Sequence, residues 1–279
     1  RLLRVHRTTR IFYGNRFFYY PLRPFNTLAN LGFGESVRCV SSFLKARLKP
    51  AMPEDNFQAW VSNRFGPRLF NIFFKTYTEK VWGIPCDHIQ ADWAIQRIKG
   101  LSLSKAVRNA LFSPRVQETS LIDSFEYPET GAGQMWETVC DRVREQGGQV
   151  LINQPVTQIR HNGKRITGVM AASDGQNQMF ECDCLISSMA LDELIRGFDP
   201  APPASVLDAV GRLRYRDFIS VCLTLEGPQL FNDQWIYIHS PEIRVARISD
   251  YKNWSRWMSP NPAITCVGME YFCFEKDKI

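Results

Sequence analysis

Apolar residues recur at every third or fourth position through the first part of the chain. Together with the Pro and Gly residues that interrupt it, this spacing predicts a mostly helical block between residues 26 and 112. The expected helices are Glu35–Lys49, Pro53–Arg64, Pro67–Trp82, Asp92–Lys99 and Ser102–Phe112. Gly83 follows the third and suits a helix end. Ahead of the block, Gly14-Asn15 separates Ile11–Tyr13 from Phe17–Tyr20 and predicts a β-hairpin.

The pattern changes after Phe125 to an alternation of helix and strand. Gly131-Ala132-Gly133 leads into a predicted helix, Gln134–Gln146. Asn162-Gly163 is a strong hairpin signal. The strands expected around it are Val150–Asn153, Val156–His161, Arg165–Ala172, Gln178–Cys182 and the apolar run Asp183–Met189, which is typical of a buried strand. A helix, Leu191–Gly197, follows.

The last part of the chain alternates between apolar and polar positions, as antiparallel strands do. The expected strands are Phe218–Leu225, Trp235–His239, Arg244–Ser249 and Thr265–Phe274. We expect this sheet and the helical block to pair as one domain, split in sequence by the α/β unit. The fold class is therefore α/β, with an α+β arrangement in the helix-plus-sheet part.

Charge is uneven along the 279 residues. Residues 1–126 hold 19 Lys and Arg against 9 Asp and Glu, whereas residues 127–279 hold 15 against 19. A basic first half suits an anionic small-molecule partner, although a solvated basic face is an equal alternative. No run of like charges is long enough for a nucleic-acid arm, so no nucleic-acid partner is expected. The aromatic content of 13% suits either a large apolar pocket or core packing.

The spacing of the Cys and His residues and the length of the apolar runs narrow the class of protein further. The eight Cys form no C-x-x-C pair and the four His have no ligand spacing, so no metal site is expected. Scattered Cys in apolar contexts indicate reduced core residues of a cytoplasmic protein. No apolar run reaches membrane-spanning length, and the first residues do not predict a signal peptide. The chain begins without Met and in mid-pattern, so we expect an interior piece of a longer enzyme; the oligomeric state is not indicated.

One turn has the form of a phosphate site. Gly131-Ala132-Gly133 before a helix offers free N–H donors to a phosphate or a flavin, although ordinary strand-to-helix turns look the same. No G-x-G-x-x-G fingerprint occurs in the chain, and neither do G-x-S-x-G, H-E-x-x-H or a P-loop. No hydrolytic centre is therefore indicated, and no catalytic residue can be named.

The stretch Tyr127–Met189 resembles a cofactor-domain segment of flavin-containing amine oxidases and protoporphyrinogen-oxidase-like proteins. The matching residues are Pro128, Gly131, Gly133, Val156, Ile159, Gly168, Asp183, Ile186 and Ser188. The resemblance implies an FAD cofactor, with Val156 beside the adenine through its backbone and Gly131, Gly133 and Ser188 among the cofactor-binding residues. Cys184 and Ala190 depart from the family pattern, which usually has a small or apolar residue and Pro there.

A second stretch, Phe74–Gly83, resembles the Y-T-x-K-x-W-G run of UDP-galactopyranose mutases, which share the flavoprotein fold. The resemblance implies that Tyr77, Thr78 and Trp82 contact a uridine diphosphate group and that Arg97 reaches its phosphates. The Arg97 match is loose, because Lys99 stands where the mutases have Pro. Thr78 and Trp82 share a helix face. The alternative is that Tyr77 and Trp82 pack the helix into the core while Lys80 reaches solvent.

The resemblance predicts three parts: a substrate or helical part at 1–125, a partial FAD-binding Rossmann-like domain at 126–200, and a substrate-domain sheet at 201–279. It implies an FAD-dependent oxidoreductase acting on a bulky small molecule, for which a nucleotide- or lipid-linked compound is one form. A flavin-dependent sugar mutase is the first alternative. A catalytically inactive fragment that lacks the pyrophosphate site is the second.

Overall fold

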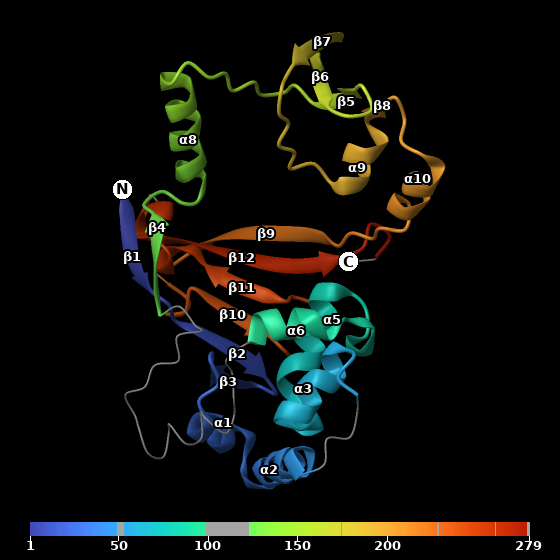
Figure 1. Ribbon diagram of the computed structural model, residues 1–279. Coiled ribbons are helices and arrows are strands. Elements are labelled where there is room, and N and C mark those ends of the chain that lie inside the picture. The colour runs from blue at the N-terminus through green and yellow to red at the C-terminus, as the bar shows by residue number, and fades with distance from the viewer. Residues whose placement is uncertain (49–52, 99–122, 174, 228, 260, 278–279) are drawn as a thin grey trace. The chain divides into compact units, whose positions relative to one another are not determined.

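The computed structural model describes residues 1–48, 53–98, 123–173, 175–227, 229–259 and 261–277 (Figure 1). They form two compact units: unit 1 comprises Arg1–Trp136 and Arg216–Ile279, and unit 2 comprises Glu137–Tyr215. The predicted helix Ser102–Phe112 lies outside the described residues.

A six-stranded sheet forms the centre of unit 1, in the order β3-β2-β10-β11-β12-β9. Its strands are β2 (Thr9–Tyr13), β3 (Arg16–Tyr19), β9 (Asp217–Glu226), β10 (Trp235–Ile238), β11 (Arg247–Asp250) and β12 (Ile264–Cys273). The last four pair antiparallel, as predicted. The N-terminal hairpin also joins this sheet, because β2 runs parallel to β10, a pairing that the sequence did not predict. A separate pair joins β1 (Leu2–His6) to β4 (Ser124–Pro128).

The turn between β2 and β3 has the predicted form. Gly14 and Asn15 both adopt positive φ, at 55° and 57°, and β2 and β3 pair antiparallel. Two successive left-handed residues match the right-handed twist of the strands they join. The hairpin prediction is therefore confirmed.

The helices of unit 1 follow the predicted block. They are α1 (Pro24–Leu31), α2 (Phe33–Leu48), α3 (Phe57–Phe65), α4 (Pro67–Phe70), a π-helical turn (Asn71–Lys75), α5 (Thr76–Trp82) and α6 (Ala91–Ile98). Short 3-10 turns lie at Cys86–His88, Tyr251–Asn253 and Arg256–Met258. The predicted helix Pro67–Trp82 is present as one helical run with a π-turn inside it, and Gly83 ends it in the left-handed conformation.

The predicted start of the next helix at Pro53 was wrong. Helix α3 begins at Phe57, after Asn56, whose backbone is extended and pairs in a single β-bridge with Gln90. The Asn56 side-chain oxygen accepts a hydrogen bond from the Ala59 N–H at 2.8 Å. Because this cap fixes an extended residue immediately before the helix, the preceding residues cannot continue it.

The core of unit 1 lies between the helices and one face of the sheet. One buried cluster, Ile11, Phe18, Cys39, Ile72 and Phe73, joins β2 and β3 to α2 and the π-turn. A second cluster within the helices contains Phe57, Trp60, Val61, Phe65, Phe70, Cys86, Ile89, Ala91 and Ala94. The helical block therefore rests on the sheet where β2 meets β10.

Among the glycines of this packing, Gly66 is the one at which we expect a substitution to destabilise unit 1 most. Its φ is +84°, and a Cβ there would lie 2.7 Å from the backbone nitrogen of Phe43 in α2. We expect Gly66→Ala to lower the free energy of unfolding by about 2–3 kcal/mol, because both strain and overlap with backbone oppose it.

The matched control for that variant is Gly14→Ala. Gly14 also has positive φ, but a Cβ there meets nothing within 4 Å, so strain alone should cost about 1 kcal/mol. Tryptophan fluorescence in a denaturant titration measures both variants, since all seven Trp lie in unit 1. Equal losses in the two variants would contradict the packing argument.

Unit 2 contains a four-stranded sheet in the order β7-β6-β5-β8. The strands are β5 (Val156–His161), β6 (Ile166–Ser173), β7 (Gln176–Glu181) and β8 (Phe198–Asp199), accompanied by α9 (Leu191–Arg196) and α10 (Ala204–Val210). Helix α8 (Gly133–Glu145) crosses the boundary between the units. The Asn162-Gly163 hairpin is confirmed: Gly163 has φ +86°, and the Asn162 side-chain oxygen accepts from the N–H groups of Lys164 and Arg165.

Two predicted strands are absent from unit 2. Neither Val150–Asn153 nor Asp183–Met189 pairs with any described strand. Asn153 has φ +62°, which ends an extended run, and Ile186 is 93% exposed instead of buried. Apolar composition alone does not make a strand, because a strand also needs a neighbour for its backbone hydrogen bonds.

Two further expectations, on membrane-spanning helices and on the cysteines, can be compared with the structure. Within the described ranges, no helix is long and apolar enough to cross a membrane. All eight Cys are free, but only Cys39, Cys86 and Cys273 are buried, whereas Cys184 and Cys222 are exposed. The interpretation of the cysteines as core residues was therefore wrong for those two, which lie in an unpaired segment and on the edge strand β9.

Candidate functional site

Strand β10 and the residue after it place three rings on one face of the sheet. Trp235, Tyr237 and His239 alternate along the chain, and two further rings extend the series, Tyr77 from α5 and Trp254 from the segment after β11. Centroids lie 5.1 Å apart for Trp254–Trp235, 6.2 Å for Trp235–Tyr237, and 5.1 Å for both Tyr237–Tyr77 and Tyr77–His239. We call these five residues the aromatic row. Its ends are Trp254 and His239, and Tyr77 is its one ring from a helix.

A charged pair lies beside the aromatic row. Arg247 is directly opposite Tyr237 on β11, and Glu270 is opposite Arg247 on β12. Arg247 donates through Nε and Nη2 to the two carboxylate oxygens of Glu270, at 2.5 Å each. Burial would lower the pKa of Arg247, but the hydrogen bond and charge of Glu270 raise it above its ordinary value. The pair is therefore ionised but neutral in sum.

Burial holds two rings of the row, those of Tyr77 and His239, in their neutral forms. Burial raises the pKa of the Tyr77 hydroxyl well above its usual range, with Tyr237 adding to the effect. Burial lowers the pKa of His239 to about 3, and the nearby charge of Lys80 lowers it too. The His239 Nδ1 atom is buried and has no partner among the described residues. At neutral pH these two rings therefore carry no charge.

Two cations fasten α5 to the sheet. Lys80 donates through Nζ to the carbonyl oxygens of Ile238 and Ser240 at 2.8 Å and of Val245 at 3.4 Å. Burial lowers its pKa to about 8, while the charge of Glu242 raises it. From the other side, Arg216 donates to the carbonyls of Lys80 at 3.0 Å and Phe272 at 2.9 Å. These bonds fix α5, and with it Tyr77, against β10.

The four residues predicted to contact a substrate do not share one environment. Tyr77 joins the aromatic row, and Thr78 is buried at 6% exposure. Trp82 meets Trp93 edge to face at 5.4 Å, in the helical core, and its Nε1 is buried without a partner in the described chain. Arg97 belongs to the α6 backbone, and its side chain lies outside the described residues. A substrate contact for these four stays a prediction.

The predicted glycines of the cofactor segment form the start of α8. Gly131 has φ +105°, and a Cβ on Gly133 would meet nothing within 4 Å. The turn is held by the Gly131 N–H on the Pro128 carbonyl at 3.1 Å. A Cβ on Gly131 would meet the Met258 side chain at 3.4 Å, whereas Gly133 leaves the backbone open at the N-terminus of a 13-residue helix, which suits a phosphate group.

Val156 and Ser188 lie in unit 2. Val156 begins β5 and pairs with Ala171 on one side, while β8 on the other side reaches only Ile159 and Arg160. The edge of β5 at Val156 is therefore not covered by a described strand, which fits a residue that would meet a ring system through its backbone. Ser188 is exposed in the unpaired segment. The cofactor roles of these residues remain predictions.

Several residues of this face carry no motif of their own. Alternation predicted the strand Trp235–His239 but not its partners, and Arg247, Glu270 and Arg216 gave no signal. Their roles arise from pairing between strands far apart in sequence. Alternation in 235–239, with a ring at every second position, was the one available indication of a shared face.

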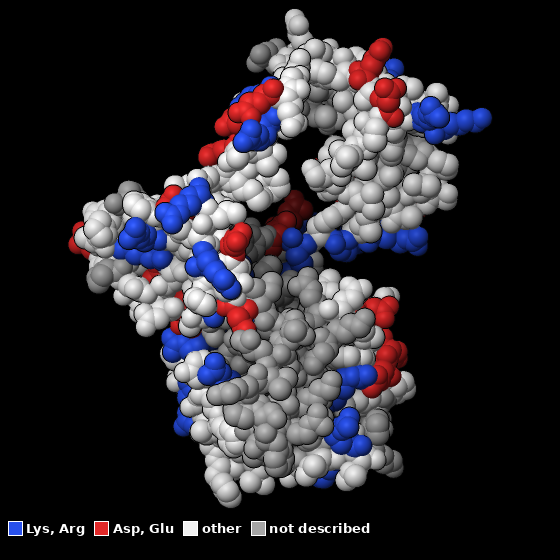
Figure 2. Space-filling model, turned by 60° about the vertical axis from the view of Figure 1, so that its left-hand side comes forward, with Lys and Arg blue, Asp and Glu red and all other residues white. Residues whose placement is uncertain are grey.

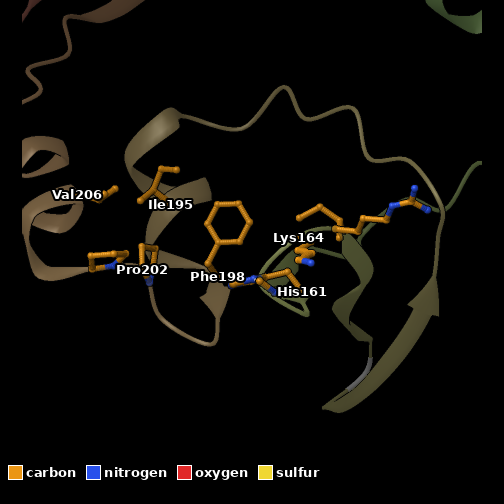
Figure 3. Close-up of a pocket in the computed structure, with 10 residues that line it drawn as sticks. His161, Lys164, Ile195, Phe198, Pro202 and Val206 are labelled. Carbon is orange, nitrogen blue, oxygen red and sulfur yellow. The ribbon is translucent and has the colours of Figure 1, made fainter.

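Unit 2 also contains an open cavity of 340 Å³ at the tip of the β5–β6 hairpin. Figure 3 shows Phe198 between His161 and Ile195, with Pro202 and Val206 beyond them. The His161 Nδ1 accepts from the Gly163 N–H at 3.1 Å, so its Nε2 donates to the Pro200 carbonyl at 2.7 Å. No predicted site residue lines this cavity.

The basic excess of the first half does not form one band on the surface that Figure 2 shows. Lys and Arg side chains there stand singly or in small groups, with Asp and Glu between them. On that face an anionic group would therefore be recognised locally rather than by a broad basic field.

Residues 55–254 match the family model of flavin-containing amine oxidoreductases. The fold is similar to a reduced UDP-galactopyranose mutase, with a TM-score of 0.81 and 17% identity over 100% of this chain and 60% of that one. An oxidoreductase from Methanosarcina mazei gives 0.65 and 13% over 99% and 62%. The cyclohexylamine oxidase from Brevibacterium oxydans IH-35A gives 0.52 and 12% over 97% and 58%. The chain thus spans about 60% of the length of these structures.

Proposed function

The chain belongs to the flavin-containing amine oxidoreductase family, and on this premise we propose that its protein is an FAD-dependent oxidoreductase that holds a bulky substrate against the aromatic row. The observation that carries the proposal is the row itself: five neighbouring rings on the sheet face, fixed by the Lys80 and Arg216 bonds. Four of the rings are half-buried and His239 is buried. Half-buried rings in series give a large apolar contact area at low entropic cost.

The protonation states support a binding face. Tyr77 and His239 stay neutral at pH 7, and Arg247 is already neutralised by Glu270. Such a face binds, orients and excludes water but offers no free base. A protein face that binds and orients the substrate is typical of flavoenzymes, in which the cofactor supplies hydride or electron transfer when it is bound.

The family match and the flavoprotein neighbours indicate FAD as the cofactor. In our proposal the backbone N–H groups at Gly131 and Gly133 donate to a phosphate group of FAD. Val156 and Ser188 are proposed separately as FAD contacts of unit 2. A Cβ on Gly133 would meet nothing within 4 Å, and no described strand covers the edge of β5 at Val156. Flavin content of Gly133→Val, read from the visible absorbance of the purified full-length protein, reports this part of the proposal.

Tyr77→Leu is expected to raise KM about tenfold, since stacking on one aromatic ring contributes roughly 1–3 kcal/mol. Flavin content should not change. Tyr77→Phe keeps the ring and should keep most of the affinity, and Trp257→Leu, an exposed ring outside the row, should leave KM unchanged. A KM equal to wild type in Tyr77→Leu contradicts a substrate on the aromatic row.

The run Tyr77–Gly83 favours one second candidate, a flavin-dependent sugar mutase acting on a nucleotide sugar. The two functions differ in net redox change. Anaerobic mixing with cyclohexylamine or protoporphyrinogen bleaches the flavin of an oxidoreductase. A mutase instead converts UDP-galactopyranose only after prior reduction and keeps its reduced flavin. A full-length protein that purifies without flavin would contradict both functions and favour an inactive chain.

A further inference from the structure

Helix α2 is apolar on the side that faces away from the protein. Five large apolar side chains are exposed along it: Phe33 (88%), Val37 (49%), Val40 (45%), Leu44 (52%) and Leu48 (85%). Their spacing places them within an arc of about 80° on the helix. The buried residues of α2, Cys39 and Ala46, lie on the opposite side. The packing of α2 against unit 1 is therefore satisfied without this stripe, which we call the outer stripe.

Basic side chains flank the outer stripe on both sides. At about 100° per residue Arg47 falls beside Val40, while Lys45 and Arg38 fall about 60° and 80° beyond Leu48, and all three are exposed. Long cationic side chains in this position lay their stems along the apolar surface and keep the charge beside it.

Acidic groups do not offset this charge. Residues 14–48 hold five Lys and Arg but one acidic residue, Glu35. Glu35 is already engaged with Arg68 and, at 3.6 Å, with Arg38. Its hydrogen bond with Arg68 holds the pKa of Glu35 below its ordinary value, so it stays ionised within these pairs. The outer stripe thus presents an apolar centre with a positive border.

We propose that α2 docks on an anionic lipid surface, with the outer stripe in the headgroup–acyl boundary and the basic border against lipid phosphates. Apolar residues along one side of a helix with Lys and Arg at its edges are the features of an interfacial helix. The position of α2 agrees, because α2 lies at the outer end of the helical part of unit 1 (Figure 1). A second copy of the chain is disfavoured, since it would bring two basic borders together.

The test is co-sedimentation of the full-length protein with phosphatidylcholine vesicles, with and without phosphatidylglycerol. Wild type should bind the anionic vesicles more tightly. Phe33→Ser and Leu48→Ser should each weaken binding about tenfold. Lys45→Gln and Arg47→Gln should each weaken it about fivefold. Leu230→Ser, an exposed apolar residue on a loop of the same unit, is the matched control and should bind as wild type does.

Circular dichroism and the melting temperature verify that each variant is folded, which these highly exposed positions favour. The proposal is overturned if the wild-type protein does not bind anionic vesicles. It is also overturned if Phe33→Ser and Leu48→Ser bind these vesicles as tightly as wild type does. Equal binding to both vesicle types overturns the anionic requirement and with it the proposal. A dimer in sedimentation equilibrium that Leu48→Ser dissolves, without vesicle binding, assigns the outer stripe to a second copy and also overturns it.

Discussion

Replacing Lys80 with methionine is expected to lower the free energy of unfolding of unit 1 by about 4 kcal/mol. Lys80 satisfies the carbonyls of Ile238, Ser240 and Val245 with one ammonium group. Methionine keeps the stem but leaves these acceptors without the donor, and hydrogen bonds to a charged group contribute roughly 1.5–3 kcal/mol each. Since Lys80 also ties α5 to the sheet, affinity at the aromatic row should fall as well.

Lys75→Met on the same helical run is the matched control for that loss. Lys75 is exposed, and its side chain makes no described hydrogen bond to the sheet, so its replacement should change stability by less than about 0.5 kcal/mol. Denaturant unfolding followed by tryptophan fluorescence compares the two. If Lys80→Met unfolds at the same midpoint as Lys75→Met, the three carbonyl bonds do not stabilise the unit.

Acid is expected to destabilise unit 1 through His239. Its pKa in the folded chain is about 3, against an ordinary value of 6.5. As the pH falls below 6.5, the unfolded chain takes up a proton that the folded chain does not, so stability is lost progressively down to about pH 3. One pKa unit corresponds to about 1.4 kcal/mol, so the whole pKa difference amounts to about 5 kcal/mol, of which about 2 kcal/mol is lost between pH 7 and pH 5.

His239→Asn should remove most of the pH dependence between pH 7 and pH 5, because asparagine does not titrate. His88→Asn, at an exposed histidine of the same unit, should leave the slope as in wild type. Unfolding free energies measured at half-unit pH intervals on the three proteins give the slopes. A wild-type slope retained in His239→Asn would show that the acid sensitivity lies elsewhere.

Features decided over a few residues could be predicted from the sequence. The Gly14-Asn15 and Asn162-Gly163 turns, the helix end at Gly83 and the helix after Gly131-Ala132-Gly133 all follow from which residues tolerate positive φ or open a helix. The resemblance to flavoproteins rested on the same local runs and agrees with the family match. Local sterics act the same way wherever the segment ends up in the fold.

The errors arose where a segment depends on a neighbour. Val150–Asn153 and Asp183–Met189 have the composition of strands, but no described strand pairs with them. The helix expected from Pro53 begins four residues later, because Asn56 is held extended by a bridge to Gln90. In each case the local preference was outweighed by pairing with distant residues, or by its absence.

For the candidate site, the sequence by itself determined that Tyr77 lies on a helix and that Trp235, Tyr237 and His239 alternate along a strand. Only the tertiary structure decided that these rings meet, that Lys80 binds strand carbonyls instead of reaching solvent, and that His239 stays neutral. Helical and strand periodicity fix which side of an element a residue occupies. Which elements share that side, and how far each group is removed from water, depends on contacts between residues about 160 positions apart.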